Sequence, residues 1–134
     1  MSNSRHSSGW ANAALVVTLG PRELGEDRWA GVAFQESLER AAFLAGGGDY
    51  TAPAQPAPDF LAGRESRSLG ETSYRFGVCP GRIDELLPAE VRDSLRGALL
   101  RFDREIPGFA SQAGLLVGVE TRSSSPLRVL RDEG

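Results

Sequence analysis

The sequence has one cysteine, one histidine and no lysine among its 134 residues. With Cys79 alone, an internal disulfide and a multi-cysteine metal site are excluded, and a reducing compartment such as the cytoplasm is expected. His6 is the only histidine, and the carboxylates show no metal-ligand spacing, so we expect no metal site. Because lysine is absent, all 15 basic residues are arginines, whose planar fork suits the recognition of anions.

Long hydrophobic runs are also missing. No stretch approaches the roughly 18–20 apolar residues of a membrane span. Residues 1–9 are polar and lack the apolar core of a signal peptide. The net charge is −3, and no basic stripe with interleaved aromatic residues is present, which argues against a nucleic-acid partner.

The length fits one domain. A chain of 14.3 kDa with 40% hydrophobic and 25% charged residues has the composition of an ordinary globular domain. The Ser-rich residues 1–9 are predicted to be flexible, and residues 10–134 to form a single domain.

Three segments are predicted to be strands. Ala11–Leu19 is a continuous apolar run, and Leu115–Thr121 and Leu127–Leu130 flank a polar turn. Two longer segments, Gly31–Ala45 and Ala89–Glu105, carry apolar residues at helical spacing along one side. These patterns predict an α+β fold with a small, mostly antiparallel sheet and two main helices packed on one face.

The N- and C-terminal strands of this predicted sheet are expected to lie together. Such an arrangement is typical of a domain inserted into another, because both ends must return to the same host. Tyr50–Ser73 shows no period and is predicted to be a long loop that docks against another part of the protein. Tyr74–Val78 is predicted to be a short strand.

Two catalytic interpretations find little support. Gly46-Gly47-Gly48 follows a predicted helix, whereas a phosphate-cradling glycine loop follows a strand and opens a helix. A hydrolase would combine His6, a serine of residues 123–125 and an aspartate such as Asp59 or Asp103. The strained G-x-S-x-G turn that exposes a serine nucleophile is absent.

The polar turn near the C-terminus is the first candidate site. It consists of Glu120, Thr121, Arg122, Ser123, Ser124 and Ser125, with Arg128 on the following strand. Its charged and hydroxyl groups either pair in solvent, as in an ordinary hairpin turn, or face a polar ligand at the mouth of the sheet. In the second case Arg122 would offer a bidentate fork to an anion.

Several segments resemble one family of proteins. They are Asn12–Val17, Phe34–Phe43, Ala52–Pro56 with Asp59–Leu61, Leu87–Pro88, Phe102–Phe109 and Gly118–Arg128. In this order they are similar to uncharacterised FAD-dependent dehydrogenases, which are distantly similar to electron-transfer flavoprotein–ubiquinone oxidoreductases. The resemblance covers nearly the whole chain and implies that it is the middle domain of a longer flavoprotein.

The resemblance implies that different parts of the parent protein bind FAD and shape the substrate site. FAD would be held by other segments of the parent protein, so this chain alone is not expected to bind it tightly. The chain would serve as a substrate or cap domain that covers the flavin and meets a small-molecule substrate, and would be inactive alone. The 120–128 turn would face the flavin or the substrate, with Gln55, Asp59 and Arg64 as weaker candidates. The alternative is a stand-alone module that binds an anion or a partner through the Glu120–Arg128 loop.

Overall fold

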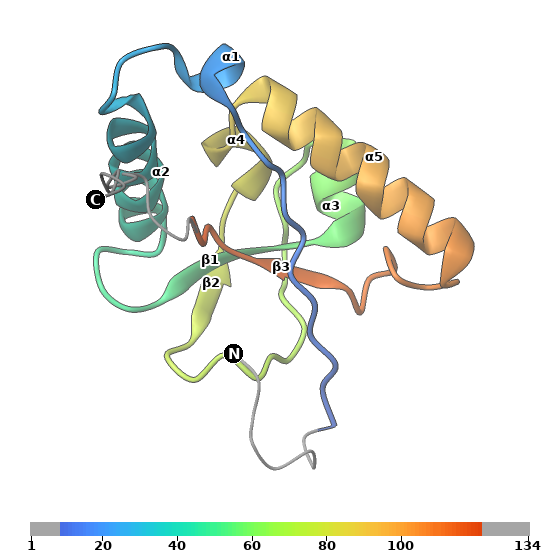
Figure 1. The fold of residues 1–134 in the computed structure, drawn as a ribbon. Coiled ribbons are helices and arrows are strands. Elements are labelled where there is room, and N and C mark those ends of the chain that lie inside the picture. Colours follow the sequence, from blue (N-terminus) through green and yellow to red (C-terminus); the bar gives the residue numbers. More distant parts are fainter. Residues whose placement is uncertain (1–8, 122–134) are drawn as a thin grey trace, which may run out of the picture.

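The computed structural model describes residues 9–121 and confirms the α+β class. In chain order the elements are α1 (Pro21–Leu24), α2 (Ala30–Ala45), β1 (Ala52–Pro56), α3 (Ala57–Ala62), β2 (Val78–Pro80), α4 (Ile83–Leu86), α5 (Ala89–Glu105) and β3 (Leu115–Val117). Figure 1 shows the small sheet below the long helix α5, with α2 standing beside the start of β1.

The sheet has the strand order β2-β1-β3 and is mixed. β1 pairs in parallel with β2, Ala52 lying opposite Val78, and antiparallel with β3, Gln55 lying opposite Leu116. The central strand β1 is almost wholly buried. β3 lies within a predicted strand, and β2 shares only Val78 with another, so the small sheet was predicted correctly but is built largely from other segments.

The central strand contains two prolines, which a central strand normally excludes. In the antiparallel ladder the odd-numbered residues of β1 face β3, as the bonds from Gly118 N to Pro53 O and from Ala57 N to Gly114 O show. Pro53 therefore lacks an N–H at the last pair of this ladder, opposite Gly118, which is one residue beyond the end of β3. Pro56 faces the other edge, past the end of β2. Both prolines therefore lie at the ends of their ladders.

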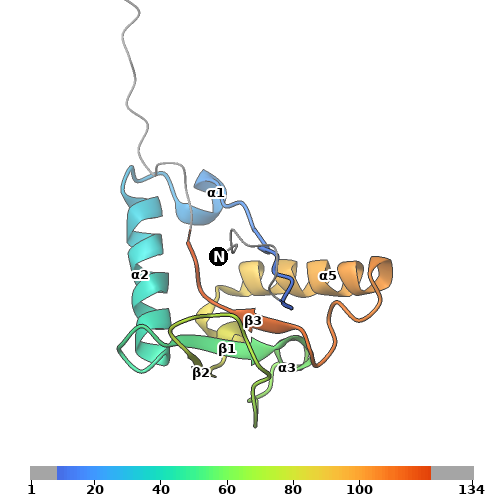
Figure 2. The same cartoon turned by 90° about the horizontal axis from the view of Figure 1, so that it is seen from below.

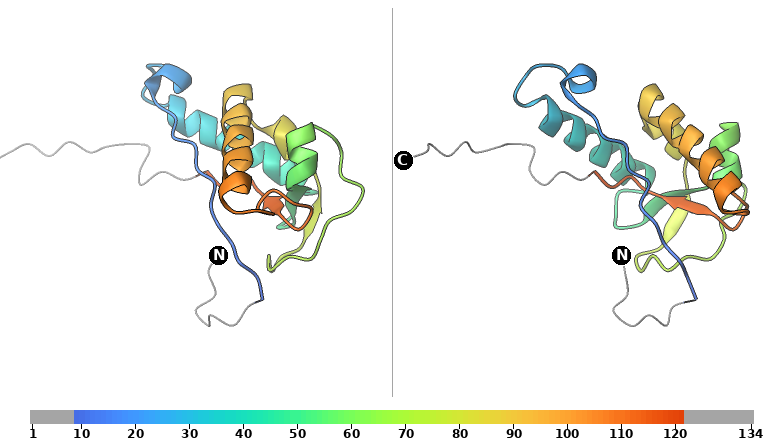
Figure 3. Two further views of the ribbon diagram at one scale, coloured as in Figure 1. Left: turned by 90° about the vertical axis from the view of Figure 1, so that its right-hand side faces the viewer. Right: turned by 45° about the vertical axis from the view of Figure 1, so that its right-hand side comes forward.

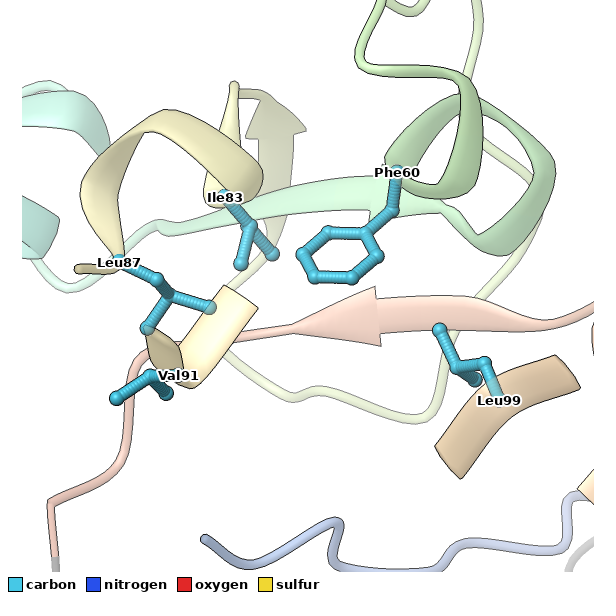
Figure 4. Packing of buried hydrophobic residues seen from close by; sticks show 5 residues of the cluster. All are labelled: Phe60, Ile83, Leu87, Val91 and Leu99. Atoms are coloured by element: carbon cyan, nitrogen blue, oxygen red, sulfur yellow. The ribbon is translucent and has the colours of Figure 1, made fainter. Parts of the chain in front are cut away.

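The two long helices lie on the same side of the sheet (Figure 2). The predicted bounds of α5 are confirmed, and α2 begins one residue earlier than predicted. The core joins one aromatic residue of α3 to aliphatic residues of α4, α5 and the turn between them. Its buried members, shown in Figure 4, are Phe60, Ile83, Leu87, Val91 and Leu99.

The prediction of a strand at Ala11–Leu19 is wrong for the described part of the chain. These residues run without secondary structure across the molecule, in front of β3 in Figure 1 and past α5 in Figure 3. Leu15, Val17 and Leu19 pack against the same core as Leu116 and Val119. The two terminal segments thus share a core, but no strand ladder joins them within residues 9–121.

The prediction of a long loop at Tyr50–Ser73 is also wrong in its first half, which forms β1 and α3. The strand predicted at Tyr74–Val78 lies later, at Val78–Pro80. The predictions of a flexible N-terminus and of a strand at Leu127–Leu130 fall on residues 1–8 and 122–134, outside the described residues.

Candidate functional site

The first candidate site lies at the end of the described chain. Glu120 is exposed, and Thr121 is half-buried. The hydroxyl of Thr121 donates a hydrogen bond to the Glu39 carboxylate, so the start of the turn is fixed against α2. Arg122, Ser123, Ser124, Ser125 and Arg128 lie outside the described residues, and their role stays a prediction.

The weaker candidates lie in a buried polar network at the carboxyl end of β1. Gln55 is the one polar residue of β1, and it is 0% exposed. Its amide nitrogen donates to the carbonyl of Arg64 at 3.0 Å and to Oδ1 of Asp84 at 2.8 Å. Its amide oxygen accepts from the backbone N–H of Asp84 at 3.1 Å. Every polar hydrogen of this amide therefore has a partner, as burial requires.

Asp84, at the first turn of α4, is the centre of the network and is 2% exposed. Arg82 donates two parallel hydrogen bonds to its carboxylate, from Nε to Oδ1 at 2.8 Å and from Nη2 to Oδ2 at 2.7 Å. Such bidentate pairs are the stronger charge-assisted hydrogen bonds. Arg82 Nη2 also donates to the carbonyl of Gly63 at 3.0 Å, which ties the end of α3 to α4.

Asp59 and Arg64 form a second pair at the rim of the network. Nε of Arg64 lies 2.6 Å from Oδ1 of Asp59. The Asp59 side chain is nearly buried, whereas the Arg64 side chain is 63% exposed. The backbone N–H of Arg64 also bonds to the carbonyl of Asp59 and so closes α3. Of the two groups, the guanidinium of Arg64 is the one that an incoming anion can reach.

Gly63 allows three arginines and two acids to gather around one turn. Its backbone is left-handed, with a φ of 63°, and a Cβ there would lie 3.0 Å from Nη2 of Arg96. Arg96, from α5, donates to the carbonyl of Phe60 through Nε and Nη2 at 3.2 and 3.1 Å. Its guanidinium also lies over the Phe60 ring, 5.8 Å from the centroid.

The arginines of this network keep its two carboxyl groups in their charged form. The hydrogen bond from Arg82 lowers the pKa of Asp84, although burial acts in the opposite direction. The hydrogen bond from Arg64 likewise lowers the pKa of Asp59 against the effect of burial. The same contact with Asp84 raises the pKa of Arg82. Both carboxylates are therefore ionised at neutral pH, so neither is set up as a general acid.

The structure thus brings Gln55, Asp59 and Arg64 together, and within residues 9–121 no hydrogen bond or ion pair joins them to Glu120 or Thr121. Sequence reasoning missed Arg82, Asp84 and Arg96. The available signal was weak, because Arg82 and Asp84 lie at the start of the short helix α4 and look like solvated charges in the sequence. We call the set Gln55, Asp59, Arg64, Arg82, Asp84 and Arg96 the Gln55 network.

The described residues do not fit the phosphates of FAD. The glycines at 46–48 follow α2 and precede β1, the reverse of the strand–glycine loop–helix order. A Cβ at Gly46 would lie 2.0 Å from the carbonyl oxygen of Thr51, so this glycine serves close packing of the chain on itself. Within residues 9–121, β1 runs directly into α3 with Pro56-Ala57-Pro58 at the junction, and β2 leads into α4 through a single glycine, Gly81, which is short of the G-x-G-x-x-G pattern.

Among residues 9–121, no three His, Cys, Asp or Glu side chains are grouped so that they could hold a metal ion. Within the same range no helix has the length and apolar character needed to cross a membrane.

Comparison with known proteins places these observations in a family. The family described as "FAD-dependent protein, C-terminal domain-like" matches residues 1–123. An uncharacterised protein of Clostridium beijerinckii is 41% identical over 125 residues, which are 91% of this chain and 24% of that protein. The chain therefore spans about a quarter of the length of this relative. A middle position in the parent and the distant similarity to ubiquinone oxidoreductases stay predictions. The chain belongs to the family of FAD-dependent protein C-terminal domain-like sequences.

Proposed function

We propose that this chain is the substrate or cap domain of an FAD-dependent oxidoreductase, a dehydrogenase acting on a small molecule. Another part of the parent protein holds FAD and supplies the redox chemistry. This domain covers the flavin, excludes water and shapes the substrate site, and it is inactive alone. The family match over residues 1–123 supports the link to an FAD-dependent parent.

The observation that carries the proposal is an exposed aromatic cluster next to the sheet. Tyr50 is 80% and Phe76 is 56% exposed, and their ring centroids lie 5.7 Å apart. Tyr74 meets Phe76 edge to face at 5.9 Å. Exposed apolar clusters of this kind mark surfaces that meet a partner, and a domain separated from its host would expose the face that it normally hides.

The saturated Gln55 network supports a role in shape more than in chemistry. Gln55 and Asp84 have used their polar groups on each other and on Arg82, so they hold α3, α4 and β1 in one arrangement. Arg64 at its rim keeps an exposed guanidinium. Together with the Glu120–Arg128 loop, this residue is a candidate for meeting an anionic group of the substrate.

The test is whether the domain shields the flavin. In the longer protein, iodide should quench the flavin fluorescence weakly. A version that lacks residues 1–134 should be quenched more strongly, and substrate should no longer reduce it. A flavin equally open to iodide in both versions would contradict the proposal. As a second arm that keeps the fold intact, Tyr50→Ser with Phe76→Ser should raise quenching if this cluster faces the flavin-binding part.

The stand-alone module is the other outcome of these experiments. It would lead if the purified chain bound an anion such as inorganic phosphate or a dicarboxylate, and if Arg122→Ala but not Arg67→Ala abolished that binding. Arg67 is exposed in the described loop and serves as the matched control.

A further inference from the structure

The segment of residues 13–19 has the character of a strand but no partner. Its sequence, Ala-Leu-Val-Val-Thr-Leu after Ala13, is rich in residues favoured in strands. Burial alternates along it, with Leu15, Val17 and Leu19 half-buried and residues 14, 16 and 18 more exposed. A period of two is the mark of an extended strand with one face on a core. Figure 3 shows the segment as a long, unwound ribbon beside α5.

The backbone of this segment is unpaired within the described chain. No backbone hydrogen bond joins residues 13–19 to any other part of residues 9–121. The neighbouring strand β3 pairs with β1 only. Rows of unpaired N–H and C=O groups on an extended, apolar segment are a template for a further strand.

The exposed side of residues 13–19 is also apolar, and there is free space beside the segment. Val16 is 79% exposed, in the middle of the apolar run. A hollow of about 530 Å³ lies between residues 14–18 and α5, and is lined there by Ser94, Leu95, Ala98 and Phe102. An added strand would find room for its side chains along this edge.

We propose that residues 13–19 form a strand with an extended segment of the parent protein that lies outside residues 1–134. The inference rests on the proposed function, because it assigns the partner to the rest of the flavoprotein. That partner is favoured because the chain spans only 24% of the relative's length, which leaves most of such a protein to supply the strand. The pairing would add backbone hydrogen bonds to the side-chain contacts and would fix the orientation of this domain on its host.

Amide hydrogen exchange tests the pairing directly. Exchange is followed at single residues by mass spectrometry, in the isolated chain and in the longer protein. In the isolated chain, residues 13–19 should exchange close to the rate of an unstructured peptide. In the longer protein, alternate amides should slow by about a hundredfold or more, since successive N–H groups of a strand point to opposite edges.

A matched pair of variants separates backbone pairing from burial. Val16→Pro removes the N–H, whereas Val16→Ala keeps it and removes the same side chain. Thr18→Pro and Thr18→Ala repeat the comparison on the same edge, and Leu15→Pro with Leu15→Ala probes the other edge. If residues 14, 16 and 18 are the protected ones, the equilibrium constant for docking of this domain on the rest of the longer protein should fall. The fall should be at least tenfold larger for the proline variants at 16 and 18 than for the alanine variants.

Three results would overturn the inference. The first is equal exchange of residues 13–19 in the isolated chain and the longer protein. The second is uniform slowing of all these amides, which indicates burial without a ladder. The third is protection in the isolated chain that rises with its concentration, which indicates a second copy. A longer protein that reduces its flavin normally while this segment stays unprotected would refute the strand alone and leave the proposed function standing.

Discussion

Gln55 and Asp84 exchange hydrogen bonds in both directions although 29 residues separate them. The amide nitrogen of Gln55 donates to the Asp84 carboxylate at 2.8 Å, and the N–H of Asp84 donates to the amide oxygen of Gln55 at 3.1 Å. One side chain from β1 thereby forms hydrogen bonds with both the backbone and the side chain at the start of α4. This contact specifies an amide at position 55, because neither a carboxylate nor an apolar group can satisfy both partners.

Gln55→Glu should therefore be strongly destabilising. The new carboxylate oxygen would face Oδ1 of Asp84 and the carbonyl of Arg64, two acceptors, in a buried site. We expect the free energy of unfolding to fall by about 3 kcal/mol. Urea denaturation of the chain measures it. The control, Gln112→Glu at an exposed position, should stay within about 0.5 kcal/mol of the parent chain. Equal effects at both positions would show that the Gln55 contact is not specific.

Two glycine-to-alanine changes should have opposite effects on the free energy of unfolding. Gly63 has a left-handed backbone and a crowded Cβ position near Arg96, so Gly63→Ala should cost about 1–2 kcal/mol. Gly97 lies in α5 with nothing within 4 Å of a Cβ, so Gly97→Ala should stabilise the chain by about 0.5–1 kcal/mol. Thermal unfolding of both variants checks the pair. A stabilising Gly63→Ala would mean that the turn holding Arg82 and Arg96 is relaxed in solution.

Stability should fall in acid, through the network carboxylates. Asp59 and Asp84 have pKa values below the ordinary 3.8, so the unfolded chain binds protons more readily than the folded chain. The stabilisation is present in full above about pH 5 and is lost as the pH falls through the lowered pKa values. Urea unfolding from about pH 6 to about pH 3 should show this loss. Asp84→Asn should flatten the profile as well as lower it, and an unchanged slope would contradict the assignment.

Arg122 tests the proposed role of the C-terminal turn. In the longer protein, Arg122→Ala should lower kcat/KM by about ten- to a hundredfold if its guanidinium holds an anionic substrate, the range expected for a hydrogen bond to a charged group. Arg67→Ala, at an exposed position, is the control and should leave kcat/KM unchanged. Steady-state kinetics with both variants make the comparison. Equal activity of the two would reduce the turn to an ordinary solvated loop.

The two long helices were predictable because local patterns define them. The stripe from Val91 to Leu99, preceded by Pro88 and followed by Pro107, predicts the bounds of α5, and Gly46 ends α2. Local chemistry agrees with tertiary structure at these places, so propensity and packing give the same answer.

The sheet was only partly predictable, because its strands depend on partners far along the chain. β1 contains Pro53 and Pro56, whose missing N–H groups are tolerable only at the ends of the ladders with β3 and β2. Residues 13–19 show the converse, a strand-like sequence without a partner in the described structure. The Gln55 network escaped detection for the same reason, since Gln55 and Asp84 meet only after folding.

FAD binding by the isolated chain and by the longer protein decides whether this domain holds the cofactor itself. Each is dialysed against FAD, and bound flavin is read from its absorbance and its fluorescence. The isolated chain should retain no flavin, whereas the longer protein should hold about one FAD per molecule, reducible by its substrate. Stoichiometric FAD on the isolated chain, or a longer protein free of flavin, would contradict the account.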